Sequence, residues 1–155
     1  MTDSQVVIAT PEWEEGIYKL LVEMHQETAL ASLDEAKSRW WIRKGLNRDK
    51  AIVGAIGTPD RVEASIGLFV GNFWYAPSDD VHLEDHWNYC GQEYRKSRHA
   101  HAMLDWARQV QTAMGMPVIL GVLSTKRTQA KVELFKRAIG KDSMVGGIFV
   151  MGLAA

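Results

Sequence analysis

A short basic segment at residues 94–100, with the sequence Tyr-Arg-Lys-Ser-Arg-His-Ala, carries the clearest chemical signal in the chain. It follows a predicted strand and opens an amphipathic helix, so it contains the unpaired N–H groups and the positive dipole end of that helix. Such a helix start binds phosphate. Arg95, Lys96 and Arg98 are cations in a place that the dipole alone disfavours, which indicates a bound anion. The segment therefore predicts a pyrophosphate-bearing ligand.

The strand before this segment carries a second set of reactive side chains. His82, Glu84 and His86 alternate along it, so a regular strand places all three on one face, with Asp85 and Trp87 on the other. Three interpretations stay open: a solvated polar face, acid–base chemistry or acceptor binding, and a zinc or iron site. We expect no metal. Glu84 is the preferred base and His86 the next, and Asp85 replaces Glu84 if a β-bulge shifts the register.

The composition is that of an ordinary globular domain, with 155 residues, 46% hydrophobic and 24% charged, and a net charge of −1. This charge does not indicate a nucleic-acid partner, although a local basic patch leaves that alternative open. The one cysteine, Cys90, allows no internal disulfide, and we expect its thiol to be a small apolar filler rather than a nucleophile. The first residues do not resemble a signal peptide, and no apolar run approaches the roughly 20 residues that span a bilayer. We expect a cytoplasmic protein with no membrane partner.

Hydrophobic periodicity and turn residues predict a single α/β domain over residues 1–155. Thr10 and the proline after it favour the start of a first helix, and a capping box from Ser32 to Glu35 favours the start of a second. Ser124 or Thr125 is the expected cap of the last helix. The predicted helices cover residues 10–28, 32–45, 98–114 and 125–139. The predicted strands cover residues 6–9, 51–56, 62–70, 81–90, 118–123 and 146–151.

This order of elements, with a basic loop after the fourth strand, resembles the GCN5-related N-acetyltransferase (GNAT) superfamily over residues 6–151. Members carry an Arg/Gln-x-x-Gly-x-Gly/Ala loop, whose amides hold the pyrophosphate of acetyl-CoA. Arg95 matches the first position and Ala100 the last, while Arg98 stands where the first glycine is usual and fits only with a negative φ. Small GNAT proteins of bacteriophages are similar also at residues 121–124 (Gly-Val-Leu-Ser) and 127–132.

The resemblance implies a GNAT-like α/β fold, with a mixed, mostly antiparallel sheet of six to seven strands flanked by four helices. It also implies acetyl-CoA as co-substrate, with its pantetheine arm beside the strand end at Cys90. Phe135 stands where many members have the tyrosine that protonates the leaving thiolate, and a phenylalanine cannot donate a proton. The predicted catalytic residues are Glu84 and His86. The predicted cofactor-binding residues are Tyr89, Cys90, Arg95, Lys96, Ser97, Arg98, His99, Ala100 and Phe135.

The first functional expectation is therefore an acetyl-CoA-dependent N-acetyltransferase that acts on a small-molecule or protein amine. Its acceptor groove would be lined by Trp40, Trp41 and Trp74. The alternative is a catalytically inactive GNAT-fold protein that binds acyl-CoA or a partner, and a third is an α/β interaction module that binds no CoA. A phage origin would place the protein in the host cytoplasm. A homodimer through the sheet edge near Met151 is also open.

Overall fold

One five-stranded sheet organises the chain, of which the structure, a computed structural model, describes residues 4–28, 30–124, 127–139 and 143–152. The strands follow one another in chain order, antiparallel from β1 to β4 and parallel between β4 and β5. They are β1 (Val7–Ile8), β2 (Ala51–Thr58), β3 (Arg61–Asn72), β4 (Val81–Cys90) and β5 (Val118–Ile119). The α-helices are α1 (Glu14–Thr28), α2 (Glu35–Leu46), α3 (His99–Met114) and α4 (Thr128–Ile139). Two short 3₁₀ helices, η1 (Pro11–Trp13) and η2 (Gln92–Tyr94), precede α1 and follow β4.

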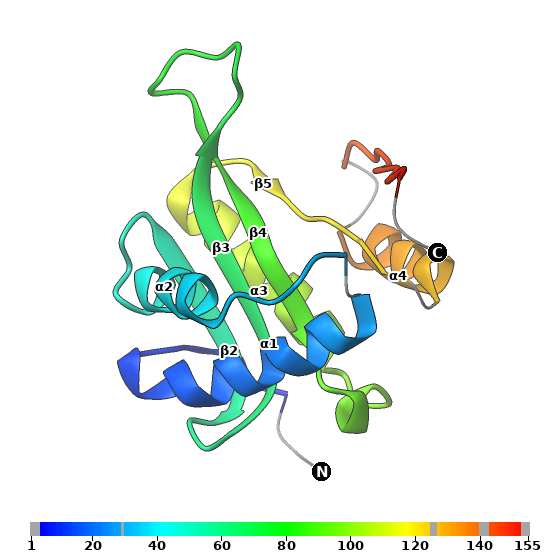
Figure 1. The fold of residues 1–155 in the computed structure, drawn as a ribbon. Helices are drawn as coiled ribbons and strands as arrows, with labels where there is room; N and C mark the ends of the chain where they lie inside the picture. Colours follow the sequence, from blue (N-terminus) through cyan, green and yellow to red (C-terminus); the bar gives the residue numbers. More distant parts are fainter. Residues whose placement is uncertain (1–3, 29, 125–126, 140–142, 153–155) are drawn as a thin grey trace.

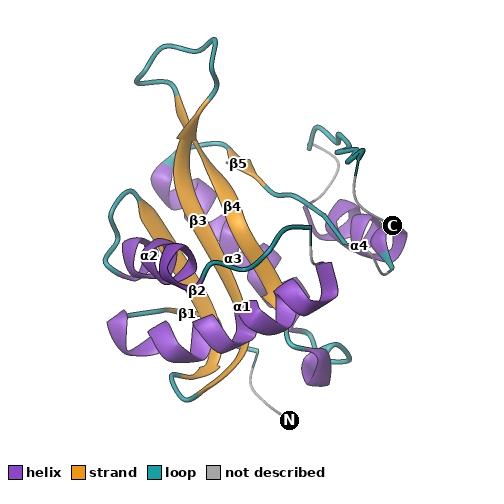
Figure 2. Ribbon diagram, viewed as in Figure 1, coloured by secondary structure: helices purple, strands orange, loops and turns teal. Residues whose placement is uncertain are grey.

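The helices cover the two faces of the sheet separately (Figures 1 and 2). α1 and α2 lie on one face, where Ile17, Ile42 and Phe69 belong to one apolar cluster. α3 lies on the other, where its Met103 and Ala107 pack against strand residues in a second cluster. The sheet is thus the middle layer between two cores. No helix in the described part of the chain is both long and apolar enough to cross a membrane.

The helix starts follow local capping chemistry, with one correction to the predicted positions. Ser32 is not the cap of α2; the helix begins at Glu35, and the side chain of Asp34 accepts a 2.9 Å hydrogen bond from the Lys37 N–H. Asp34 is an equally good cap residue and stands directly before the helix. Ser124 likewise stands four residues before α4, and Thr125 lies outside the described residues.

A β-bulge in β4 corrects the predicted face of one tryptophan. Gly67 of β3 pairs with Trp87, and the next β3 residue pairs with Asp85, so His86 is the extra residue of the bulge. His86 and Trp87 therefore both reach Phe69, with ring centroids 4.2 and 5.5 Å away. Trp87 lies on the α1–α2 side of the sheet and not opposite His86, because the bulge interrupts the alternation of side chains.

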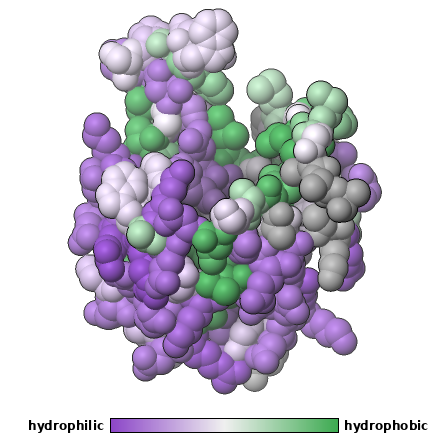
Figure 3. All heavy atoms as spheres, in the orientation of Figure 1, coloured by the Kyte–Doolittle hydropathy of each residue, from purple (hydrophilic) through white to green (hydrophobic). Residues whose placement is uncertain are grey.

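The sheet has five strands among the described residues, not the six to seven predicted. Residues 146–151 form no strand, and their apolar side chains are exposed, with Phe149 at 94%. The physical reason is that β5 covers only two residues, so it offers no long edge to a further strand. Figure 3 shows hydrophobic residues on the side of the molecule where residues 143–152 lie, whereas the surface over α1 and α2 is mostly hydrophilic.

Gly67 provides a test of the packing at the bulge. A Cβ at this position would lie 2.5 Å from the Trp87 ring, so Gly67→Ala should force the indole away. We expect a loss of about 1–3 kcal/mol in the free energy of unfolding, measured by urea denaturation. Gly146→Ala is the matched control, since a Cβ there meets nothing within 4 Å. Equal stability of the two variants would contradict this packing.

Candidate functional site

The candidate site begins where β4 and β5 separate. The two strands pair at only two positions, which involve Val118 and Ile119 of β5. Beyond them the Gly121 N–H donates to the side chain of Asp85, at 2.9 Å, instead of to a β4 carbonyl. In Figure 1 the chain after β5 runs away from β4 towards α4. On this side, the second half of β4 up to Cys90 pairs with no strand of the described chain.

The basic loop joins the end of this free edge to the start of α3. Arg98 directly precedes α3 with a φ of −93°, so the negative φ required of an arginine at this position is present. Its side chain makes no capping hydrogen bond. Instead the Ser97 hydroxyl accepts from the His99 N–H at 3.1 Å and donates to the Tyr94 carbonyl at 2.6 Å. The loop therefore folds without the usual glycine, and the first turn of α3 adds N–H groups that have no acceptor within the helix.

Arg95, the first residue of the loop motif, lies in a polar cluster against α1. Its guanidinium pairs with Glu27 and lies 3.3 Å from the Tyr89 hydroxyl. That hydroxyl also lies 2.8 Å from Glu27 and 3.1 Å from Glu23. Burial, and then the bond to Glu27, raise the pKa of Tyr89, so this phenol stays protonated at neutral pH. Arg95 is held in place by an internal carboxylate.

Lys131 of α4 is a cation at the same place that the sequence did not single out for a role. Its Nζ donates to the Ser124 hydroxyl at 2.7 Å. Burial, and then the charge of Arg95, lower the pKa of Lys131 against the opposing charge of Glu27, with a smaller contribution from Arg127. Two elements far apart in the chain thus bring repelling cations together, an arrangement that an anion would stabilise. The signal in the sequence that could have found Lys131 is its helical spacing from Phe135, four residues later on α4.

Three side chains of β4 meet on the α1–α2 side, as predicted. The Glu84 carboxylate lies 3.0 Å from His82 Nε2 and 3.7 Å from His86 Nε2. His82 is buried, whereas Glu84 is partly exposed. His86 stacks on Phe69, and its burial lowers its pKa against the opposing charge of Glu84. A neutral imidazole next to a carboxylate can accept a proton and be stabilised as an imidazolium. In the described residues, no group of His, Cys, Asp and Glu side chains is arranged to hold a metal ion.

Asp85 is a third candidate for the base. Burial raises its pKa to about 6, although the hydrogen bond from the Gly121 N–H opposes this shift. A carboxyl group with a pKa near neutrality is suited to proton transfer. β4 has a β-bulge, the condition under which Asp85 was to replace Glu84, and Asp85 lies directly before it, in the gap between β4 and the chain that follows β5.

Other predicted residues are placed more simply. Cys90 packs against the α3 core, and burial raises its pKa to about 11, which fits an apolar filler and not a nucleophile. Phe135 is half-buried on α4, Lys96 is exposed and Ala100 is half-buried. His99, predicted to bind the cofactor, has a side chain that is 0% exposed, because the ring turns inward from the first turn of α3.

The tryptophans predicted to line an acceptor groove lie in two places. Trp41 contacts His86, with ring centroids 4.5 Å apart, and Trp40 packs against Trp41 while 55% exposed. Trp74 lies instead on the loop between β3 and β4, 94% exposed and beside Tyr75. Of the three, Trp41 contacts the candidate base His86, and Trp40 is joined to it only through Trp41.

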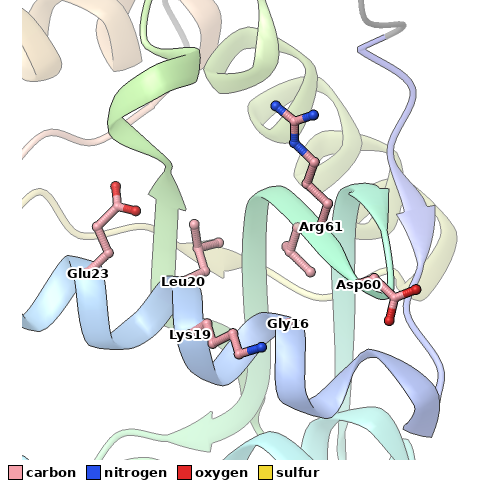
Figure 4. A pocket seen from close by; sticks show the side chains of 7 residues that line it. Gly16, Lys19, Leu20, Glu23, Asp60 and Arg61 are labelled. Carbon is pink, nitrogen blue, oxygen red and sulfur yellow. The ribbon is translucent and has the colours of Figure 1, made fainter.

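A separate depression lies between α1 and the turn that joins β2 to β3 (Figure 4). No predicted catalytic or cofactor-binding residue lines it, so we do not place the acceptor there. Its lining residues are Gly16, Lys19, Leu20, Glu23, Asp60, Arg61 and Val62.

Comparison with known proteins identifies the fold. No protein-family model and no curated protein sequence matches the chain. Among solved structures, a GCN5-related N-acetyltransferase from Ralstonia eutropha JMP134 superposes with a TM-score of 0.68 at 17% identity, over 96% of this chain and 99% of that one. The chain has the GNAT fold. A predicted acetyltransferase from Clostridium acetobutylicum, solved with acetyl-CoA, gives a TM-score of 0.68 at 12% identity over 96% of each chain. An aminoglycoside acetyltransferase from an uncultured soil metagenomic sample, in complex with sisomicin, gives 0.64 at 9% identity, again over 96% of each chain.

Asp85 should make the stability of the protein depend on pH. Its folded-state pKa of about 6 lies above the value of 3.8 expected in the unfolded chain, so stability falls as pH rises from 4 to 6 and the penalty then persists. Asp85→Asn keeps an acceptor for the Gly121 N–H and removes the charge. We expect urea denaturation to show a gain of about 2–3 kcal/mol at pH 7.5 and none at pH 3.5. A gain of equal size at both pH values would show that burial of the charge is not its cause.

Proposed function

We propose that the protein is an acetyl-CoA-dependent N-acetyltransferase of the GNAT superfamily. One observation carries the proposal: the free edge of β4 ends at Cys90, next to the basic loop and the start of α3. A long, flexible ligand with a pyrophosphate group can pair with the strand edge along its arm and with the helix start through its phosphates. The match of the whole fold to acetyltransferases, one of them solved with acetyl-CoA, supports the same ligand.

The residues along this path have the chemistry that acetyl-CoA requires. The Nδ2 atom of Asn88, in the half of β4 beyond its pairing with β5, is buried and has no hydrogen-bond partner among the described residues. A buried amide without a partner is costly, and an acceptor atom on the ligand's pantetheine arm would satisfy it. At the other end, Arg95, Arg98 and Lys131 supply cations for the phosphates. Arg95 would exchange its partner Glu27 for a phosphate oxygen.

The proton of the incoming ammonium is assigned to His86. When bound, acetyl-CoA supplies an acetyl thioester whose carbonyl carbon bonds to the amine nitrogen as its bond to sulfur breaks. The lowered pKa of His86 leaves its imidazole free to accept the proton, and Glu84, 3.7 Å away, would stabilise the charged ring. Phe135 donates no proton, and a thiolate whose conjugate acid has a pKa of about 8.5 leaves without a dedicated acid.

The acceptor would approach from the α1–α2 side, where Trp41 contacts His86 and Trp40 packs against Trp41. The partly exposed Glu84 would attract a cationic amine, whether of a small molecule or of a protein. The aminoglycoside acetyltransferases among the structural neighbours make small cationic acceptors the first class to assay. The second candidate function is an inactive protein that binds acyl-CoA, which Phe135 favours. A phage origin, a cytoplasmic location and a homodimer stay predictions.

Cofactor binding is tested at the basic loop and on α4. Arg95→Ala, Arg98→Ala and Lys131→Ala should each raise the Kd for acetyl-CoA about tenfold, measured by isothermal titration calorimetry, because each removes a charged donor. The control is Lys136→Ala, on the same helix, whose amine pairs with Glu133. Unchanged affinity in all three variants would refute the phosphate role. Absence of binding by the wild-type protein at millimolar acetyl-CoA would refute the proposed co-substrate.

Catalysis is tested by release of free CoA thiol with a panel of amines. His86→Gln should lower kcat by about 10²–10⁴-fold with little change in acetyl-CoA affinity, because it removes the proton acceptor. The wild-type rate should fall as pH drops below the lowered pKa of His86, and His86→Gln should lack this limb. Asp85→Asn is the matched comparison. If Asp85→Asn loses activity while His86→Gln retains it, the base is Asp85. If none of the amines in the panel causes the wild-type protein to release CoA thiol, the inactive acyl-CoA binder is favoured.

A further inference from the structure

The geometry points to Glu63 as a positioning residue that holds the cofactor loop in its binding conformation through His99. This inference rests on the proposed function and adds to it two residues outside the path of the ligand. Glu63 belongs to β3, and both its backbone and its side chain contact the loop.

Glu63 fastens the two ends of the loop at once. Its carbonyl accepts from the Gly91 N–H at 2.9 Å, at the point where the loop leaves β4. Its carboxylate lies 2.7 Å from Nε2 of His99, the first residue of α3, where the loop ends. The seven residues between these two points include all three predicted phosphate-binding cations of the loop. One strand residue therefore fixes the distance between the end of β4 and the N-terminus of α3.

The pair is buried more deeply than solvent-facing catalytic groups would be. The side chain of His99 is 0% exposed and that of Glu63 is 7% exposed. The second ring nitrogen of His99, Nδ1, lies 3.0 Å from the Ser4 hydroxyl, so both ring nitrogens have partners. A hydroxyl can donate or accept, so Ser4 keeps this bond whichever nitrogen carries the proton. Buried polar groups satisfied in this way specify a single geometry.

The middle of the loop is built around the same imidazole. The Tyr94 ring packs on His99 with centroids 5.8 Å apart, and its hydroxyl accepts from Arg61 Nε at 2.7 Å. Ser97 bridges the Tyr94 carbonyl and the His99 N–H. A loop that lacks the usual glycine is thus held in shape by side chains from β3. Preorganisation of this kind raises affinity because the ordering entropy is lost on folding and not on binding.

The test compares four variants at one temperature at which circular dichroism shows all of them folded. Glu63→Ala removes the carboxylate, and Glu63→Asp draws it back from His99 on a shorter side chain. Each substitution should raise the Kd for acetyl-CoA about tenfold. Glu63→Gln retains an acceptor for Nε2–H and should rescue affinity to within about threefold of wild type. Val110→Ala is the control for lost stability, since this buried α3 residue lies in the second half of the helix. Glu63→Asp keeps the test available should Glu63→Ala not fold.

Two readouts separate positioning from a general loss of stability. Hydrogen exchange of peptides covering 91–100 should accelerate in Glu63→Ala and Glu63→Asp but not in Val110→Ala. At saturating acetyl-CoA the kcat of Glu63→Ala and Glu63→Asp should stay within about twofold of wild type, while their KM for acetyl-CoA rises. Wild-type affinity in both Glu63→Ala and Glu63→Asp, or equal weakening in Val110→Ala, would overturn the inference and leave the proposed function intact. Failure of the wild-type protein to bind acetyl-CoA would overturn both.

Discussion

The candidate site depends on the early separation of β4 from β5. Parallel strands normally continue to exchange backbone hydrogen bonds along their length. Here β4 and β5 pair at only two positions, and the Gly121 N–H then donates to the Asp85 side chain instead of to a backbone carbonyl of β4. This leaves backbone donors and acceptors along β4 for another partner. The bulge at His86 lies close by in the same strand and puts Trp87 on the α1–α2 side as well, where both rings reach Phe69. Ligand path and candidate base therefore lie on the same strand.

Cations from two elements lie close together at the far end of this path. Arg95 is balanced by Glu27, while Lys131 is half-buried with a lowered pKa beside it. The dipole of α3 adds partial positive charge from its first turn. A dianionic group entering here would meet cations from two elements and need not reorganise the sheet. This makes the loop better supported as a binding element than any single residue is as a catalyst.

Much of the fold could be predicted from the sequence, because its signals are local. The buried stripe of α3, which includes Met103 and Ala107, follows from periodicity alone. The side of Trp87 and the burial of His99 could not be predicted in this way, because each depends on contacts with β3. The strand expected at 146–151 has the right residue types, but strand formation needs a neighbouring edge, which a two-residue β5 does not offer.

For the site, the shared face of His82, Glu84 and His86 was predictable from alternation, whereas the bulge at His86 entered only as a condition for Asp85. Lys131 escaped prediction because its nearness to Arg95 joins two elements separated by more than 30 residues. The buried pair behind the loop escaped for the same reason. Local patterns show what a residue can do, whereas long-range contacts decide which residues meet.

The bonds from Glu63 of β3 to the two ends of the loop affect which residues of the loop can be substituted without a change of fold. A loop whose course is fixed at Gly91 and His99 by one glutamate does not depend on glycines for its shape. Loop residues outside these contacts, such as the exposed Lys96, could then change while the fold persists. A sequence pattern that requires those glycines would fail to match such a chain even while its backbone keeps the same course. The chain keeps its fold over 96% of its length at 17% identity to one solved GNAT structure.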